Sequence, residues 1–159
     1  MKRNNHGFTL IEIVVVLVLI SIIAATVFTR SITTDQINFV GQADKIISHV
    51  YYAQSMAMKR NEVWGIFNTG NEYWLFQWKN PGDEVNRKHL PGYESDIISL
   101  SELKITMSYF LLYFDGIGKP YEMNAYNPIA TDLEITISNL DSSQSKIFYI
   151  TPETGLIRQ

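Results

Sequence analysis

The chain opens with a short basic leader and then a long uncharged apolar run, which limits what the remainder can fold into. Residues 13–29 carry no charge, Lys2 and Arg3 precede them, and Arg30 follows. As a helix, residues 8–29 would be about 33 Å long at ~1.5 Å per residue, close to the ~30 Å hydrocarbon core of a bilayer. The basic leader predicts a cytoplasmic N-terminus with the rest of the chain sent across.

A carboxylate at the leading edge of the run separates three interpretations. A secretory signal could be cut near Ala24-Ala25, but its apolar region would be shorter. A plain signal anchor has the right length. Neither gives a reason for Glu12, and a carboxylate in a spanning helix is costly enough that a functional role is the first expectation.

The third interpretation accounts for the carboxylate. The run Gly7-Phe8-Thr9-Leu10-Ile11-Glu12 resembles the class III signal of type IV pilins and type II secretion pseudopilins. The resemblance implies that prepilin peptidase cleaves after Gly7, that the new terminus at Phe8 is N-methylated, and that Glu12 pairs with the terminal amine of a neighbouring subunit. Methylation retains the positive charge. In a low dielectric each ion is less costly when paired, and the helix dipole favours a carboxylate in the first turns.

The helix is expected to continue beyond the apolar run to about Arg60. No proline occurs before Pro81, Ser21–Arg30 lacks both glycine and proline, and Gly41 is the only weak point. Residues at steps of three and four predict one buried stripe, broadened by Val40 and Ile47: Phe39, Ala43, Ile46, Val50, Ala53 and Ala57. The opposite face is predicted to be mostly polar: Asp35, Asn38, Gln42, Lys45, His49, Tyr52, Met56 and Lys59.

After Asn61 the pattern changes to short strands. Two aromatic and β-branched segments, 63–67 and 73–78, are joined by Asn68-Thr69-Gly70-Asn71 and predict a hairpin. We expect Trp74, Phe76 and Trp78 to share the strand face that packs against the helix. Further strands are predicted at 105–114, at 133–138 by alternation, at 146–150, and after Gly155.

These segments predict an α+β fold, with one long helix packed on a small antiparallel β-sheet domain. The expected organisation is a cleaved leader over 1–7, the membrane and assembly half of the helix over 8–29, its amphipathic half over 30–60, and the β domain over 61–159.

Three later segments resemble a narrower group, the minor pilins that include the H-type pseudopilins of type II secretion. They are Ala53–Asn61, Tyr113–Pro120 and Ile150–Ile157. The sequence has no cysteine, unlike major pilins that close a C-terminal disulfide loop. The presence of Glu12 distinguishes this chain from the tip pseudopilin, which characteristically lacks that residue. The resemblance implies other pilin subunits and the inner-membrane assembly platform as partners.

Residues for other chemistry do not gather in the sequence. His6 leaves with the leader, and His49 and His89 lie far apart without neighbouring ligand types, so neither a metal nor a cofactor is expected. Asp115 is expected to be a hydrogen-bonded turn residue rather than a calcium ligand. No pair of nucleophile and base stands out, so the chain is not expected to be an enzyme.

Nucleic acid is the alternative partner. Some relatives in the minor-pilin group take up DNA through arginines near the C-terminus, and Arg158 is the one arginine here. Removal of Lys2 and Arg3 lowers the 13 basic residues to 11, against 16 acidic ones. Binding to phosphates through counterion release needs clustered positive charge. DNA binding is therefore the weaker hypothesis.

Prepilin peptidase is expected to cut the chain between Gly7 and Phe8. In cells with active prepilin peptidase, the protein extracted from membranes should begin at methylated Phe8. Mass spectrometry of the intact chain and of its N-terminal peptide measures both the cut and the methyl group. Recovery of chains that still begin at Met1 would contradict the prediction.

Overall fold

The computed structural model describes residues 9–159 except 79 and 123–127, and it describes no side chains over 25–37. Gly7 and Phe8 therefore lie outside the described residues. The chain divides into two compact units, Met1–Asn38 and Phe39–Gln159. The elements in chain order are α1 (Leu10–Arg60), β1 (Trp64–Asn68), β2 (Glu72–Gln77), η1 (Glu84–Asn86), β3 (Arg87–Lys88), β4 (Ile98–Ser99), β5 (Ile105–Met107), β6 (Phe110–Phe114), β7 (Pro120–Glu122), β8 (Leu133–Asn139), β9 (Ser145–Ile150) and β10 (Ile157–Arg158).

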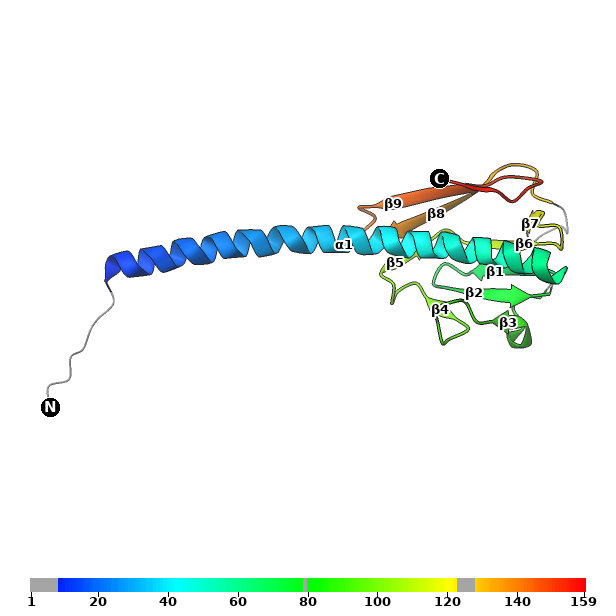
Figure 1. Ribbon diagram of the computed structural model, residues 1–159, viewed down its shortest axis with the longest axis horizontal. Helices are drawn as coiled ribbons and strands as arrows, with labels where there is room; N and C mark the ends of the chain where they lie inside the picture. The colour runs from blue at the N-terminus through cyan, green and yellow to red at the C-terminus, as the bar shows by residue number, and fades with distance from the viewer. Residues whose placement is uncertain (1–8, 79, 123–127) are drawn as a thin grey trace. The chain divides into compact units, whose positions relative to one another are not determined.

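The strands of the second unit form two antiparallel sheets, so the fold is α+β as predicted. The first sheet has the order β3-β2-β1-β6-β7, with β4 also paired to β2, and the second has the order β10-β9-β8-β5. In Figure 1, β8 and β9 lie above α1 while β2, β3 and β4 lie below it. One apolar core joins the helix to strands of both sheets.

The predicted helix stripe is confirmed. Its six residues, from Phe39 to Ala57, are all buried, and Ile47 broadens the stripe as expected. Two assignments are wrong. Val40 is 49% exposed, and His49, which was placed on the polar face, is only 2% exposed. His49 lies at the edge of the stripe, where the 90–93 turn covers it: its ring meets the edge of Tyr93 at a centroid distance of 5.7 Å.

The C-terminus of α1 is closed by a Schellman motif. Asn61 takes a left-handed φ of 53°, and the Glu62 N–H donates to the Ala57 carbonyl at 3.3 Å. Gly116 packs directly on this turn, because a Cβ there would lie 2.0 Å from the Asn61 side-chain oxygen. The helix end and the turn after β6 are thus fitted to each other.

The predicted hairpin is confirmed as β1 and β2, but its aromatic faces are reversed. Trp74 and Phe76 are buried in a separate cluster, whereas Tyr73 and Leu75 belong to the core that contains the helix. Trp78 is 55% exposed, and its φ of 72° ends the strand. The expectation that 74, 76 and 78 pack on the helix is therefore wrong.

The segment after β2 explains the reversal. The Trp74 indole N–H donates to the Pro81 carbonyl at 2.8 Å, and the Arg87 guanidinium lies 4.9 Å from the Trp74 ring centroid. Residues 80–96, which follow β2, thus fold back on its outer face and shield it. A strand covered on both faces is apolar on both, so alternation cannot assign its sides.

The segment predicted as one strand region over 105–114 is shared between the sheets. β5 pairs with β8 in the second sheet, and β6 pairs with β1 in the first. Asn68 ties this crossing to the hairpin, since its buried side-chain amide donates to the Ser108 carbonyl at 2.6 Å. Because the chain crosses between the sheets here, the one short segment over 105–114 supplies a strand to each sheet and so contributes to the core from both sides.

A glycine pair tests this packing. A Cβ at Gly65 in β1 would lie 2.4 Å from the Leu112 carbonyl oxygen of β6. Gly65→Ala should therefore lower the free energy of unfolding by about 1–3 kcal/mol, the usual cost of overpacking. Urea unfolding of the fragment from Thr33 onward measures the effect. We expect that fragment to fold alone, because its apolar stripe is buried against its own strands.

The matched control is Gly41→Ala. Gly41 lies in α1 with nothing within 4 Å of an added Cβ, so alanine should stabilise by roughly 0.5–1 kcal/mol through helix propensity. Equal effects of the two substitutions would contradict the packing assigned to β1.

Candidate functional site

The apolar part of α1 begins with a hydroxyl cap. The Thr9 Oγ1 accepts a hydrogen bond from the Glu12 backbone N–H at 3.3 Å. The Thr9 carbonyl accepts the N–H groups of Glu12 at 3.1 Å and of Ile13 at 3.3 Å. These bonds satisfy donors that a helix N-terminus otherwise leaves open. Thr9 therefore fixes the turn that carries the Glu12 carboxylate.

Glu12 lies in the first turn of α1, and its side chain is exposed. The partial positive charge of the helix N-terminus favours an anion at this position. The structure thus places one of the three predicted site residues. It does not bring Glu12 together with Phe8, which lies outside the described residues, so their pairing stays a prediction.

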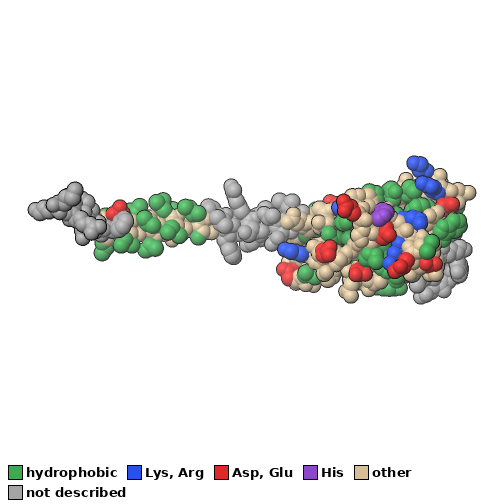
Figure 2. Space-filling view, turned by 90° about the horizontal axis from the view of Figure 1, so that it is seen from below, with side chains coloured by type: hydrophobic (Ala, Val, Ile, Leu, Met, Phe, Trp, Pro, Cys, Tyr) green, Lys and Arg blue, Asp and Glu red, His purple; other side chains and the backbone are tan. Residues whose placement is uncertain are grey.

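The surface that follows Glu12 is apolar on every side. All described residues over 9–24 are exposed, and Figure 2 shows this segment covered almost entirely by hydrophobic side chains on the face in view. The large apolar side chains, each at least 45% exposed, are Leu10, Ile11, Ile13, Val14, Val15, Val16, Leu17, Val18, Leu19, Ile20, Ile22 and Ile23. A helix that is hydrophobic all round needs a cover from outside itself.

In the described part of the chain, no helix combines the length and the apolar character that crossing a membrane requires. The predicted span over 8–29 extends into positions that are not described. It stays a prediction.

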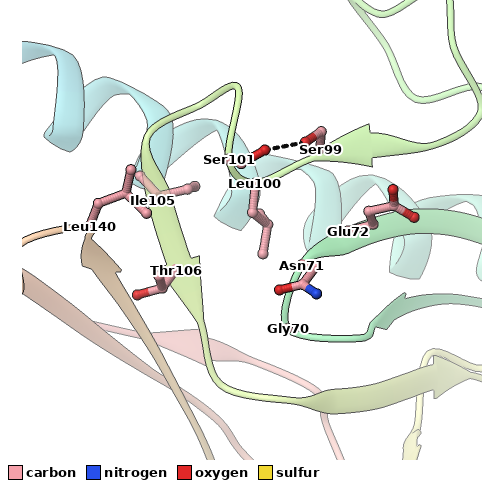
Figure 3. Close-up of a pocket in the computed structure, with 9 residues that line it drawn as sticks. All are labelled: Gly70, Asn71, Glu72, Ser99, Leu100, Ser101, Ile105, Thr106 and Leu140. Carbon is pink, nitrogen blue, oxygen red and sulfur yellow. Dashed lines mark hydrogen bonds between the residues drawn. The ribbon is translucent and has the colours of Figure 1, made fainter.

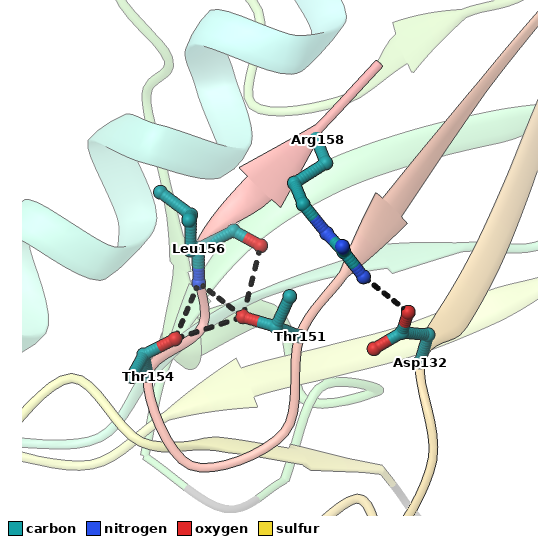
Figure 4. Close-up of polar contacts among 5 residues, drawn as sticks. All are labelled: Asp132, Thr151, Thr154, Leu156 and Arg158. Carbon is teal, nitrogen blue, oxygen red and sulfur yellow. Dashed lines mark hydrogen bonds and ion pairs between the residues drawn. The ribbon is translucent and has the colours of Figure 1, made fainter.

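The C-terminal arginine of the alternative hypothesis is already paired. The Arg158 guanidinium donates to the Asp132 carboxylate at 2.5 Å (Figure 4). The neighbouring turn is held by hydroxyls, with Thr151 and Thr154 joined at 2.8 Å and both accepting the Leu156 N–H. This surface offers a phosphate no uncompensated arginine among the contacts drawn in Figure 4.

Asp115 is a turn residue, as expected. Its Oδ1 accepts the backbone N–H groups of Ile117 at 3.0 Å and Lys119 at 2.9 Å, and its Oδ2 accepts the Tyr121 hydroxyl at 3.0 Å. The hydrogen bond to Asp115 raises the pKa of the Tyr121 phenol. Both carboxylate oxygens are engaged in shaping the turn.

A cavity of about 300 Å³ opens between the β1–β2 hairpin and β5 (Figure 3). Among its lining residues, all of them described, Glu72 is the only acidic or basic one, and Ser99 and Ser101 are hydrogen-bonded to each other at 2.9 Å. The described residues contain no group of three or more His, Cys, Asp or Glu that could hold a metal. Nothing in this cavity resembles an activated nucleophile with its base.

Sequence reasoning overlooked two residues here. Thr9 lies within the motif, and its role as a cap has a local signal, because Thr-x-x-Glu before an apolar run is the pattern of a capping box. His49 was treated as a surface residue. No local pattern gives its burial, because the turn that covers it comes more than forty residues later.

The comparisons with known proteins bear on the same N-terminal segment. A family model described as a prokaryotic N-terminal methylation motif matches residues 2–28. Neither a curated protein nor a solved structure matches the chain. The match supports the predicted class III prepilin signal, and such a signal implies peptidase processing, membrane anchoring and assembly with similar subunits.

Thr9 gives a direct test of the cap. Thr9→Val removes the hydroxyl while keeping the side-chain shape, and we expect it to cost about 1 kcal/mol, or roughly fivefold in opening of the first turn. Hydrogen exchange of the Glu12 and Ile13 amides, with the protein in detergent micelles, measures that opening. Thr9→Ser keeps the oxygen and should preserve protection. Equal protection in both variants would contradict the cap.

Proposed function

We propose that this type IV pilin-like protein is a minor structural subunit of a type IV pilus or of a type II secretion pseudopilus. In this role prepilin peptidase cuts after Gly7, the terminus at Phe8 is methylated, and the subunit polymerises through its N-terminal helix. The chain acts as a building block and not as a catalyst.

The proposal rests on the methylation motif together with the exposed apolar surface of the helix that the motif includes. The motif covers residues 2–28, and within it a fully exposed apolar helix carries a single carboxylate, Glu12, over its described residues. Leaving one Leu, Ile or Val side chain in water rather than buried costs about 1.5–3 kcal/mol. Twelve such residues need lipid before assembly and neighbouring helices after it.

The charge distribution supports a single-pass orientation. Lys2 and Arg3 precede the apolar run and would hold the N-terminus in the cytoplasm. In a bacterial inner membrane this orientation sends Phe39–Gln159 to the extracytoplasmic side. That unit has its own core of buried apolar residues, so it can fold outside the membrane.

A minor position agrees best with the C-terminal unit. It is closed without a disulfide, because the sequence has no cysteine. Gln54 of α1 instead ties two turns together, since its side-chain amide donates to the carbonyls of Gly118 at 3.0 Å and Thr154 at 2.9 Å. The genes next to this one would distinguish the two fibres: secretion genes would indicate the pseudopilus, and pilus genes would indicate the pilus.

DNA uptake, the alternative considered for a minor pilin, gains no support from the C-terminal unit. Arg158 is offset by Asp132 at 2.5 Å, and the net charge of the whole chain is −3. A DNA-binding surface would need several cations on one side to release counterions.

Glu12 supplies the test of assembly. Glu12→Gln keeps shape and hydrogen bonding but cannot form an ion pair with the amine at Phe8 of a neighbour. The variant should insert, be cleaved and fold normally. We expect its recruitment beside another pilin to fall about tenfold or more, because a desolvated cation is left without its partner. Glu12→Ala should behave similarly.

Crosslinking through a cysteine introduced at Ile20 of the exposed helix measures recruitment, and the natural chain has no cysteine to interfere. The matched control is Glu102→Gln, which removes an exposed carboxylate from the turn before β5. Crosslinking at the natural level in Glu12→Gln would refute the charge-pairing mechanism while leaving the family resemblance intact.

A further inference from the structure

A buried histidine lies beneath a surface turn in the C-terminal unit. His49 projects from α1, and its Nδ1 lies 3.1 Å from the Tyr73 hydroxyl of β2. The ring also hydrogen-bonds the backbone of Pro91. Since proline has no N–H, the imidazole is the donor in that bond. The neutral ring therefore has one nitrogen donating to the turn and one accepting from β2.

The turn that covers His49 comprises Leu90, Pro91, Gly92 and Tyr93. Its Tyr93 N–H donates to the Leu90 carbonyl at 3.2 Å, and Gly92 takes a φ of 83° that favours glycine. Leu90 is 2% exposed and Tyr93 is half-buried, whereas Pro91 and Gly92 face solvent. The Tyr93 ring and the Pro91 carbonyl contact His49, and the Tyr93 ring also contacts Lys45 of α1. Leu90 belongs to the apolar core that contains the α1 stripe.

The surroundings of the ring suit a neutral imidazole only. The described groups that face it are the phenols of Tyr73 and Tyr93 and, one turn earlier on α1, the ammonium of Lys45. The Lys45 Nζ lies 4.0 Å from the Tyr93 ring centroid. Among these described neighbours there is no carboxylate to compensate a second positive charge. Burial raises the pKa of Tyr73, which keeps its hydroxyl protonated and able to donate.

We propose that the 90–93 turn is an acid-released latch: protonation of His49 frees the turn from α1 and uncovers Leu90. A protonated ring has donors on both nitrogens, so the Tyr73 hydroxyl would have to turn and accept from the ring instead of donating to it. The added charge also lies close to Lys45 in a buried site, where an unpaired ion is costly. Opening the turn lets water reach the ring. This device is separate from the assembly role of the N-terminal helix.

The sign of the effect follows from linkage. Burial first, and Lys45 to a smaller extent, lower the pKa of His49 to about 4 in the closed form, against 6.5 when the ring is solvated. Closure is therefore fully favoured above pH 6.5 and loses free energy as the pH falls from 6.5 towards 4. The open form should gain on the order of 50-fold between pH 7.5 and pH 4.5, since each unit of pH in that window changes the ratio up to about tenfold.

A second histidine, His89, lies in the same segment and contacts a carboxylate. The His89 Nδ1 lies 3.0 Å from an Asp96 carboxylate oxygen, and both side chains are largely exposed. This contact is an ion pair only when His89 is protonated. The test must separate the two histidines.

The experiment uses the full chain in detergent micelles and follows hydrogen exchange of the Tyr93 amide, corrected for the intrinsic effect of pH. Protection should fall on the order of 50-fold from pH 7.5 to pH 4.5, while that of Ile66 in β1 changes little. His49→Gln should lose this pH dependence, and His89→Gln should keep it. Unchanged protection at Tyr93, an equal fall at Ile66, or the same fall in His49→Gln would each overturn the latch.

A second measurement covers the case in which His49→Gln does not fold. NMR of the natural chain can follow the His49 ring and the Tyr93 ring through the same titration. The latch requires both rings to change together at one midpoint. Protonation of His49 with no change at Tyr93 would overturn the proposal.

Discussion

The globular unit depends on burial of one stripe of α1 between two sheets. Ala43, Val50, Ala53 and Ala57 are fully buried on that stripe. Their small side chains leave room for apolar residues of β1, β2 and β6 from one sheet and of β8 and β9 from the other, which belong to the same core. Because both sheets use the same stripe, neither can keep its core without the helix. Thus the second half of α1 is part of the globular fold.

The sequence predicts those elements of the fold that have only one face covered by the rest of the chain. The stripe from Phe39 to Ala57 repeats at three and four residues because only one side of that helix meets the sheets. Ile135 and Ile137 alternate with polar neighbours for the same reason, since one face of β8 is buried. A single covered face gives a period that can be read directly.

The failures arise where a distant segment supplies the cover. Tyr73-Trp74-Leu75-Phe76 is apolar throughout, because the helix covers one side and the loop after β2 covers the other. His49 looks like a surface residue until the 90–93 turn is placed over it. At the N-terminal site the motif itself predicted Glu12. The hydroxyl cap at Thr9 could also have been predicted, since it is a matter of local spacing.

The two halves of α1 differ in how much apolar surface they leave exposed. This difference indicates what the proposed ion pair contributes. The apolar stripe from Phe39 to Ala57 is buried within the chain, whereas the large apolar side chains described over 9–24 are exposed. Apolar burial is non-directional, so such a surface associates with lipid as readily as with another helix. A carboxylate in the first turn changes this, because only a neighbour that brings a cation to that depth relieves its desolvation. The proposed pairing of Glu12 with the Phe8 amine would therefore set which partner is accepted and in what register, while the apolar surface supplies the affinity.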